Sequence, residues 1–215
     1  MDRHDEKNFN LLSQLINKDA VLVDVGAHRG LYTFFFLDQL DSDKGQIYTI
    51  ELNPETFKVL EARFSYKPNV TLINKAICDS DGTIEYYVGD TTHQTNIIGH
   101  DMGNNKNDVG GTVESIRLDT LLKDEKEITV LKIDVEGAEI AVLKGAEGIM
   151  SRVNHILLEC HLDEDWPEVR ELIIGKYGFS CYNMETNGIV NASTQQRPYQ
   201  CFCTNKDIVQ HIVKN

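Results

Sequence analysis

The chain of 215 residues carries 34 acidic and 21 basic side chains, so its formal net charge at neutral pH is −13. This excess of negative charge repels phosphate backbones and anionic lipid headgroups, which disfavours nucleic acid and membrane surfaces as partners. Hydrophobic residues make up 41% and charged residues 26% of the chain, as is typical of a globular protein with one sizeable core. Small molecules or a cationic cofactor are the favoured ligands.

The five cysteines lie mostly within apolar runs, and we expect them to be reduced thiols in the core. Cys201 and Cys203 alternate along the extended stretch YQCFCT, which predicts that both lie on one sheet face rather than around a metal ion. No apolar run approaches the roughly 20 residues of a membrane helix, and the first residues lack the pattern of a secretory leader. The expected location is the cytoplasm.

Strand and helix patterns alternate along the first part of the chain. The start of one helix is well marked, because Asn53 is a suitable N-cap, Pro54 fits the first helical position and Glu55 fits the first turn. The predicted elements, in chain order, are helix 7–17, strand 21–25, helix 31–40, strand 45–52, helix 53–64, strand 69–77, turn 79–82 and extended segment 83–88.

A polar segment without periodicity, 89–112, predicts a long functional loop. Regular patterns then resume with segment 112–122, strand 127–134, helix 136–150, strand 153–161, helix 166–178, strands 179–184 and 199–204, and a short final helix. Strands separated by helices predict βαβ units. We therefore expect a single α/β domain over 1–215, with a mainly parallel sheet and helices on both of its faces.

Acidic residues follow several of the predicted strands, at the sheet edge where α/β proteins bind ligands. The turn GAHRG has His28 where a dinucleotide site would place a second glycine, so a close pyrophosphate contact is disfavoured. Glu51 follows Gly30 by 21 residues at the end of the second strand, where a carboxylate can accept both ribose hydroxyls. A nucleoside without phosphates and with a positive charge, such as S-adenosylmethionine, fits this pattern.

Five longer motifs follow one another along residues 20–182. They are DVGAHRGLYTFFF, IYTIELNPETFKVLEARF, NVTLINKAICDSDGTIEYY, VESIRLDTLL and VLKIDVEGAEIAVLKGAEGIM with ILLECH. In this order and spacing they resemble the FkbM family of S-adenosylmethionine-dependent methyltransferases, and KIDVEGAE followed by LKGA is the most specific element. The resemblance implies a Rossmann-like methyltransferase fold with a seven-stranded sheet whose last strand is antiparallel. Residues 1–19 then form an N-terminal helix, and 183–215 add a C-terminal strand and helix.

The resemblance also assigns a cofactor site and a reaction. It implies O-methylation of a hydroxyl on a sugar, glycan or other small metabolite. Independently of the resemblance, the long loop and residues 184–200 are the regions that we expect to select the acceptor. The methionine part would lie beside the glycine turn, the ribose at Glu51 and the adenine near Ala76 and Ile77. The predicted cofactor-binding residues are Asp24, Gly26, Ala27, His28, Gly30, Glu51, Leu52, Ala76, Ile77 and Asp134.

Methyl transfer to an alcohol needs an activated hydroxyl. His161 and Glu159 are two positions apart at the end of one predicted strand, and Asp134 ends its neighbour. These three predicted catalytic residues form either a base with its orienting carboxylate or a site for Mg²⁺ or Mn²⁺. Glu136 and Glu139 begin the next predicted helix, where the helix dipole alone accounts for a carboxylate.

Two other functions remain open. An N-methyltransferase acting on protein or nucleic acid would place an NPPY-like motif where this chain has DVEG, so the sequence disfavours this function. The negative net charge disfavours it as well. A non-catalytic nucleoside-binding protein would keep the cofactor strands but lack a base, and His161 with Glu159 disfavours this reading.

Overall fold

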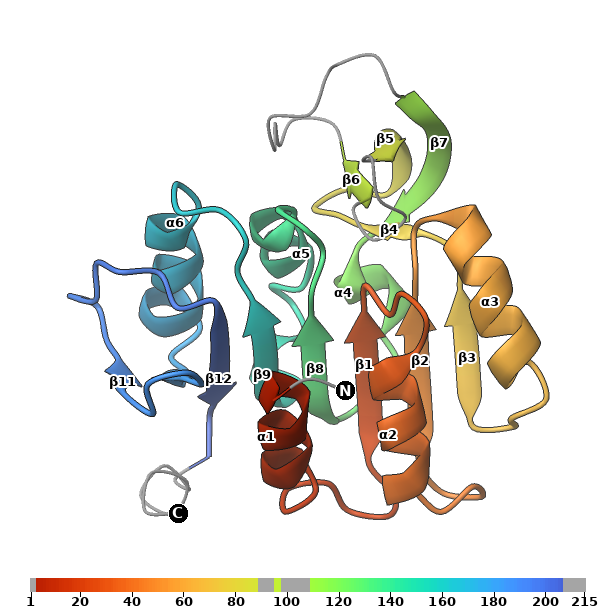
Figure 1. The fold of residues 1–215 in the computed structure, drawn as a ribbon, viewed down its shortest axis with the longest axis horizontal. Helices are drawn as coiled ribbons and strands as arrows, with labels where there is room; N and C mark the ends of the chain where they lie inside the picture. Colours follow the sequence, from red (N-terminus) through yellow and green to blue (C-terminus); the bar gives the residue numbers. More distant parts are fainter. Residues whose placement is uncertain (1–2, 89–94, 98–108, 207–215) are drawn as a thin grey trace.

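Eight strands form the main sheet of the computed structural model, in the order β11-β10-β12-β9-β8-β1-β2-β3 (Figure 1). The structure describes residues 3–88, 95–97 and 109–206. The strands are β1 (Val21–Val25), β2 (Gln46–Ile50), β3 (Val70–Ile73), β8 (Ile128–Ile133), β9 (Val153–Glu159), β10 (Ser180–Asn183), β11 (Ile189–Val190) and β12 (Gln200–Thr204).

The pairing is parallel from β3 to β9, whereas β12 runs antiparallel to both β9 and β10. The expected mainly parallel sheet with an antiparallel last strand is confirmed. The expected number of seven strands is wrong, because the two-residue strand β11 pairs with β10 and adds an eighth at the edge.

A second, four-stranded sheet extends beyond the carboxyl ends of β1 and β2 in Figure 1. Its strands are β4 (Ala76–Ile77), β5 (Gly82–Val88), β6 (Thr95–Ile97) and β7 (Val109–Ile116). The single strand expected over 69–77 is therefore divided between two sheets. The division falls at Asn74, whose side-chain amide donates to the carbonyl oxygens of Glu51 at 2.8 Å and Leu52 at 3.1 Å.

The polar segment 89–112 is not a loop throughout, because β6 and the first residues of β7 lie within it. Strand β5 pairs antiparallel with both of them, so the segment belongs to the smaller sheet at these positions. The rest of the segment lies outside the described residues.

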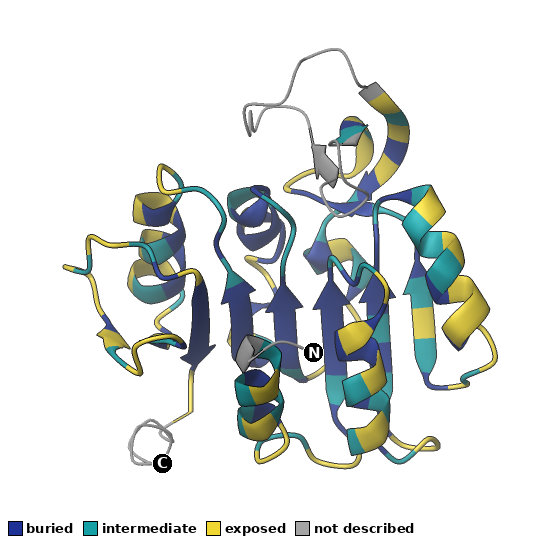
Figure 2. Cartoon of the chain, viewed as in Figure 1, coloured by how far each residue is buried: buried dark blue, intermediate teal, exposed yellow. Residues whose placement is uncertain are grey.

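Helices cover both faces of the main sheet, as expected. They are α1 (Arg3–Leu12), α2 (Leu31–Gln39), α3 (Pro54–Phe64), α4 (Leu118–Leu121), α5 (Glu139–Gly145) and α6 (Trp166–Arg170), with the 3₁₀ turn η1 (Met150–Arg152) and the π-helical segment η2 (Glu171–Lys176). Side chains alternate between the two faces along each strand, so the sheet separates two hydrophobic cores. Leu22 packs in the core with Leu12 and Phe36. Val23 packs in the other core, with Val142 and Trp166. The central strands are buried, and exposed residues lie mostly on helices and connections (Figure 2).

Several helix boundaries differ from the prediction. Helix α1 begins and ends earlier than 7–17, α5 is shorter than 136–150, and the helix after Trp166 continues as η2. The predicted start of α3 is confirmed, since the Asn53 side chain accepts hydrogen bonds from the amides of Glu55 and Thr56. The short final helix lies outside the described residues.

The expectation that all five cysteines are reduced is wrong for one pair. Cys181 on β10 lies directly opposite Cys203 on β12, with their Cα atoms 4.1 Å apart, and the two form a disulfide. The antiparallel pairing creates this neighbour, which spacing along the sequence does not reveal. Cys78, Cys160 and Cys201 are free and buried.

The turn after β1 is held between the ends of two other strands. The amides of Gly26 and Ala27 both donate to the carbonyl oxygen of Ile50, at 3.0 and 2.9 Å. Gly26 has a φ of +74°, and a Cβ atom at this position would lie 1.7 Å from the carbonyl oxygen of Asp134. Only glycine fits here, because the turn contacts the β8 backbone directly.

Gly26→Ala should lower the free energy of unfolding by roughly 2 kcal/mol or more, since it adds a backbone clash to the cost of a left-handed conformation. Gly178→Ala is the matched control, because Gly178 has a φ of +76° and a Cβ added there would meet no atom of the described residues within 4 Å. Gly178→Ala should lower the free energy of unfolding by only about 1 kcal/mol. Equal losses in a urea titration would contradict the close approach at Gly26.

His155 on β9 is packed at the opposite end of the sheet from the glycine turn. Its Nδ1 lies 2.9 Å from the hydroxyl of Thr204, and its ring stacks on Phe202 with centroids 5.5 Å apart. Burial lowers the pKa of His155 to about 4, with a smaller contribution from the charge of Lys206.

The protein should lose stability through His155 as the pH falls from about 6.5 to about 4, because the unfolded imidazole takes up a proton there and the folded one does not. Relative to His155→Gln, the free energy of unfolding of the parent should fall by roughly 1 to 2 kcal/mol over this pH interval. This value is smaller than the pKa shift alone would give, because the ring is partly in contact with solvent. Denaturant titrations of both proteins at several pH values measure this difference. A constant difference would show that His155 does not titrate as described.

Candidate functional site

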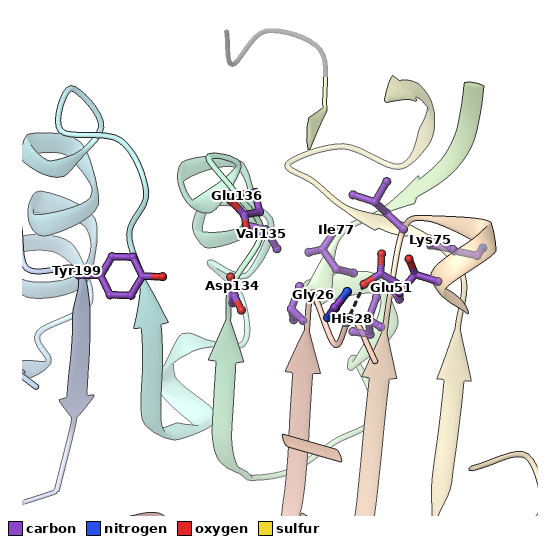
Figure 3. Close-up of a pocket in the computed structure, with 13 residues that line it drawn as sticks. Gly26, His28, Glu51, Lys75, Ile77, Asp134, Val135, Glu136 and Tyr199 are labelled. Atoms are coloured by element: carbon purple, nitrogen blue, oxygen red, sulfur yellow. Dashed lines mark hydrogen bonds between the residues drawn. The ribbon is translucent and has the colours of Figure 1, made fainter. Parts of the chain in front are cut away.

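A cavity of about 450 Å³ opens at the carboxyl ends of β1, β2 and β8, the sheet edge that the sequence predicts (Figure 3). It is lined by Val25, Gly26, His28, Ile50, Glu51, Leu52, Thr56, Lys75, Ile77, Asp134, Val135, Glu136 and Tyr199. The lining combines apolar side chains with several carboxylates. This composition suits a ligand with both apolar and hydrogen-bond-donating parts.

Glu51 is held rigidly at the end of β2 with only 7% of its surface exposed. Its two carboxylate oxygens accept hydrogen bonds from the backbone amides of His28, at 2.9 Å, and Asn53, at 2.8 Å. Burial raises the pKa of Glu51, and the two amides partly oppose that rise. Each oxygen retains acceptor capacity, so the carboxylate can receive two further donors from a ligand in the cavity.

Two residues other than glycine adopt left-handed backbone conformations in the cavity wall. His28 has a φ of +49° in the turn after β1, and Glu136 has a φ of +54° in the turn after β8. Such conformations cost free energy and persist where the surrounding structure fixes them. In His28 this conformation accompanies the hydrogen bond from its backbone amide to Glu51. In Glu136 it places the side chain beside Asp134 in the cavity.

The structure divides the predicted cofactor residues into two groups. The cavity is lined by Gly26, His28, Glu51, Leu52, Ile77 and Asp134. The others pack behind it: Ala27 contacts the cluster of Leu60 and Phe64, Gly30 faces Phe64, Ala76 is buried in the core of the smaller sheet, and Asp24 is fully buried. These four residues support the wall of the cavity.

Lys132 is a buried cation that the sequence analysis did not single out. Its ammonium lies 3.2 Å from Asp24 and 3.3 Å from Asp134, and donates to the carbonyl oxygen of Gly26 at 2.7 Å. Burial lowers the pKa of Lys132, but the charges of Asp134 and Asp24 outweigh burial and raise that pKa overall. The only signal in the sequence is a lysine within the apolar strand VLKI.

Further contacts join Lys132 to the N-terminal helix. The ring of Tyr32 lies 5.4 Å from the Lys132 ammonium, and the Tyr32 hydroxyl accepts a hydrogen bond from the side-chain amide of Asn8 at 2.7 Å. The same Asn8 amide donates to Gln200 at 2.8 Å. Asn8 is 1% exposed, so helix α1 contributes a buried polar link between α2 and β12.

His161 lies among four carboxylates, three of which are close to its Nε2 atom. The distances from Nε2 are 3.4 Å to Glu159, 3.6 Å to Glu136 and 3.7 Å to Asp134, while Nδ1 lies 2.7 Å from Glu139. The three predicted catalytic residues are thus brought together, and Glu136 and Glu139 join them.

The charges around His161 determine its protonation. Burial lowers the pKa of His161, but the hydrogen bonds to Glu139 and Glu159 and the charge of Glu136 outweigh burial and raise the pKa to about 10. Without another cation at the cluster, the imidazole is therefore protonated at neutral pH. A protonated imidazole does not fit the first of the two predicted alternatives, a general base.

Glu139 has a specific contact beyond the helix-dipole role predicted for it. It is fully buried at the first position of α5, and its Oε1 accepts from the Gly137 amide at 3.1 Å as well as facing His161. Its other carboxylate oxygen is buried and has no hydrogen-bond partner among the described residues. Because Glu139 holds the Nδ1 side of the ring, Nε2 faces the other carboxylates.

One set of donor atoms has the spacing of a metal site. Oxygen atoms of Asp134 and Glu136 and a ring nitrogen of His161 lie within 4.8 Å of one another. The predicted ligand set named Glu159 in place of Glu136, and both carboxylates are near Nε2. Two carboxylates and one imidazole are ligands that Mn²⁺ and Mg²⁺ accept.

Tyr199 forms a wall of the cavity; the sequence analysis included it in the predicted acceptor region 184–200 but did not single it out. It comes immediately before β12, 38 residues after His161 along the chain, and its ring lies edge-on to that imidazole with centroids 6.1 Å apart. Only the insertion of β12 between β9 and β10 brings it there. His93 and His100, in the polar segment, lie outside the described residues.

Comparison with protein families gives one match that covers most of the chain. The model of the methyltransferase FkbM domain matches residues 24–181. Among curated proteins, the hexuronic acid methyltransferase AglP of Haloferax volcanii is 26% identical over 178 residues, covering 80% of this chain and 68% of AglP. The AMB antimetabolite synthetase AmbE of Pseudomonas aeruginosa is 24% identical, and the match covers 68% of this chain but only 9% of AmbE.

Solved structures show the same fold. A methyltransferase FkbM from Methylobacillus flagellatus superimposes with a TM-score of 0.53 at 14% identity, covering 88% of this chain, which spans 44% of that protein. A putative methyltransferase from Streptococcus mutans in complex with SAH gives 0.51 at 12% identity, covering 95% and 98% of the two chains. A putative rRNA methylase from Clostridium thermocellum gives 0.57 at 8% identity, covering 94% of each.

No helix within the described residues is long and apolar enough to cross a membrane. The motifs named in the sequence analysis, over residues 20–182, nearly coincide with the family match over residues 24–181. The chain therefore belongs to the family of methyltransferases with an FkbM domain.

Proposed function

We propose that this protein transfers a methyl group from S-adenosylmethionine to a hydroxyl of a sugar, glycan or other small metabolite. The observation that carries the proposal is one cavity that contains both Glu51, suited to a ribose, and the cluster of Asp134 and Glu136 beside His161. A cofactor and an acceptor bound in it would meet near Asp134. Such positioning is the main requirement of an in-line methyl transfer.

The shape and charge of the cavity support the cofactor. S-adenosylmethionine offers two ribose hydroxyls to Glu51, apolar adenine contacts to Leu52 and Ile77, and a sulfonium to the acidic wall. The complex of the Streptococcus mutans methyltransferase with SAH supports the same class of ligand, through likeness of fold.

The relatives and the charge of the chain bear on the acceptor. AglP, by name a hexuronic acid methyltransferase, supports a carbohydrate acceptor. Some structures of similar fold are named rRNA methylases, but their identity to this chain is low and the net charge of −13 opposes binding to a phosphate backbone. A nucleic acid acceptor is therefore the weaker alternative.

Residues around His161 fit a divalent cation as the group that activates the hydroxyl. In a neutral ring, Nδ1–H donates a hydrogen bond to the buried Glu139, and the lone pair of Nε2 then faces Asp134 and Glu136. Lys132 holds one Asp134 oxygen from the opposite side. When bound, the cation lowers the pKa of a coordinated hydroxyl. Asp134, Glu136 and His161 would hold it, and Glu159 would accept a hydrogen bond from the acceptor.

Glu51→Ala should weaken the binding of S-adenosylmethionine by roughly tenfold to a hundredfold, because it removes a charged hydrogen-bond acceptor worth about 1.5 to 3 kcal/mol. Calorimetric titration of the folded variant measures the dissociation constant. Glu55→Ala is the control, since Glu55 is an exposed carboxylate on the adjoining helix that does not line the cavity. Unchanged affinity in Glu51→Ala would contradict the assignment of the ribose to Glu51.

Treatment with EDTA should abolish methyl transfer, and added Mg²⁺ or Mn²⁺ should restore it, because the hydroxyl loses the cation that activates it. Asp134→Asn should prevent restoration, whereas Asp41→Asn, at an exposed carboxylate outside the cavity, should respond like the parent. Production of S-adenosylhomocysteine reports the rate. Full turnover after chelation would show that no divalent cation activates the hydroxyl, and a general base would then be the alternative.

A further inference from the structure

Tyr199 lies at the end of the cavity opposite to Glu51. Tyr199 precedes β12 and Glu51 follows β2, and β9, β8 and β1 lie between these two strands in the main sheet. The Tyr199 ring projects along the carboxyl ends of the strands toward Asp134 in Figure 3. A cofactor with its ribose at Glu51 therefore leaves the Tyr199 end of the cavity to the acceptor.

The backbone around Tyr199 is fixed on both sides. Its carbonyl oxygen accepts a hydrogen bond from the Cys160 amide at 2.9 Å, and its own amide donates to Glu185 at 3.4 Å. The next residue, Gln200, is 5% exposed and accepts a hydrogen bond from Asn8. The ring is thus presented from a rigid position, so a ligand that stacks on it loses little free energy to ordering of the protein.

Tyr199 nevertheless keeps a large surface in contact with solvent. The residue is 43% exposed, whereas the neighbouring His161 side chain is 9% exposed. Because Tyr199 also lines the cavity, its ring is available there to a ligand. The face of the ring carries partial negative charge, which attracts the weakly positive C–H groups of a saturated ring.

Carboxylates surround this aromatic face. The Tyr199 hydroxyl interacts with Glu159, and burial together with that contact raises the pKa of Tyr199. Asp134 and Glu136 also lie near enough for their charges to act on the phenol. The acceptor end therefore offers one aromatic face with Glu159, a strong hydrogen-bond acceptor, at its border.

A pyranose ring matches this arrangement. It has C–H groups on a face and several hydroxyl donors around its edge, and hydrogen bonds from hydroxyls to carboxylates are among the stronger ones. A planar phenol or catechol can also stack, but it lacks the face of C–H groups that the partial negative charge of the tyrosine ring attracts. The aromatic face thus favours a polyhydroxylated saturated ring.

We propose that Tyr199 is the binding platform for the acceptor: its ring stacks on the apolar face of a pyranose, and Glu159 accepts a hydrogen bond from a sugar hydroxyl. This inference rests on the proposed function and specifies its acceptor subsite. It makes Tyr199 a determinant of acceptor binding, with no part in binding the cofactor.

Binding of methyl glycosides to the SAH-loaded protein tests the proposal. The probes are methyl glucopyranoside, methyl galactopyranoside and methyl glucuronide, with catechol as the aromatic rival, and calorimetry or saturation-transfer NMR measures their affinities. Tyr199→Leu should weaken sugar binding about tenfold, while Tyr199→Phe, which keeps the ring, should stay within about threefold of the parent. Both variants should bind SAH as the parent does, which also shows that they are folded.

Tyr66→Leu is the matched control, because Tyr66 is a 70% exposed tyrosine after α3 that does not line the cavity. It should leave sugar affinity unchanged. Equal sugar affinities in the parent and Tyr199→Leu, binding of catechol alone, or binding of none of the sugars would each overturn the platform. Failure of the parent to bind SAH would instead overturn the proposed cofactor, whatever the sugars do.

Discussion

The buried ammonium of Lys132 is the interaction on which the geometry of the cavity depends. It neutralises Asp24, contacts Asp134 and binds the carbonyl oxygen of Gly26, so one positive charge joins the ends of β1 and β8. An unpaired carboxylate at the fully buried Asp24 would be strongly unfavourable, which fixes the position of the lysine in turn. Gly26 and Asp134 both line the cavity, so this part of its wall is held in place by a residue that does not line it.

Much of the fold could be predicted because local patterns determine it. The apolar strands, the cap at Asn53 and the glycine turn each have a signature within a few residues, and the structure contains all three. The division of strand 69–77 could not be predicted, because apolar residues on both sides of Asn74 are equally suited to one strand or two. What separates them is a side-chain bond from Asn74 to a different part of the chain.

The candidate site could be predicted where residues directly follow a strand, as for Glu51, Asp134 and His161. Tyr199 could not be predicted in this way, since its place depends on the insertion of β12 between two strands that are earlier in the sequence. No local sequence pattern predicts the charge of His161 either. It results from Glu139, Glu159 and Glu136 on three segments of the chain, whose combined effect outweighs the desolvation of the ring.

The link through Asn8 gives the first helix a part in supporting a cavity that it does not line. One amide group contacts Tyr32, which lies against Lys132, and also Gln200, which follows Tyr199. The two ends of the cavity therefore share a support that lies before the family-matched residues 24–181. A shortened protein limited to the matched residues would lack Asn8, and with it the hydrogen bonds to Tyr32 and Gln200.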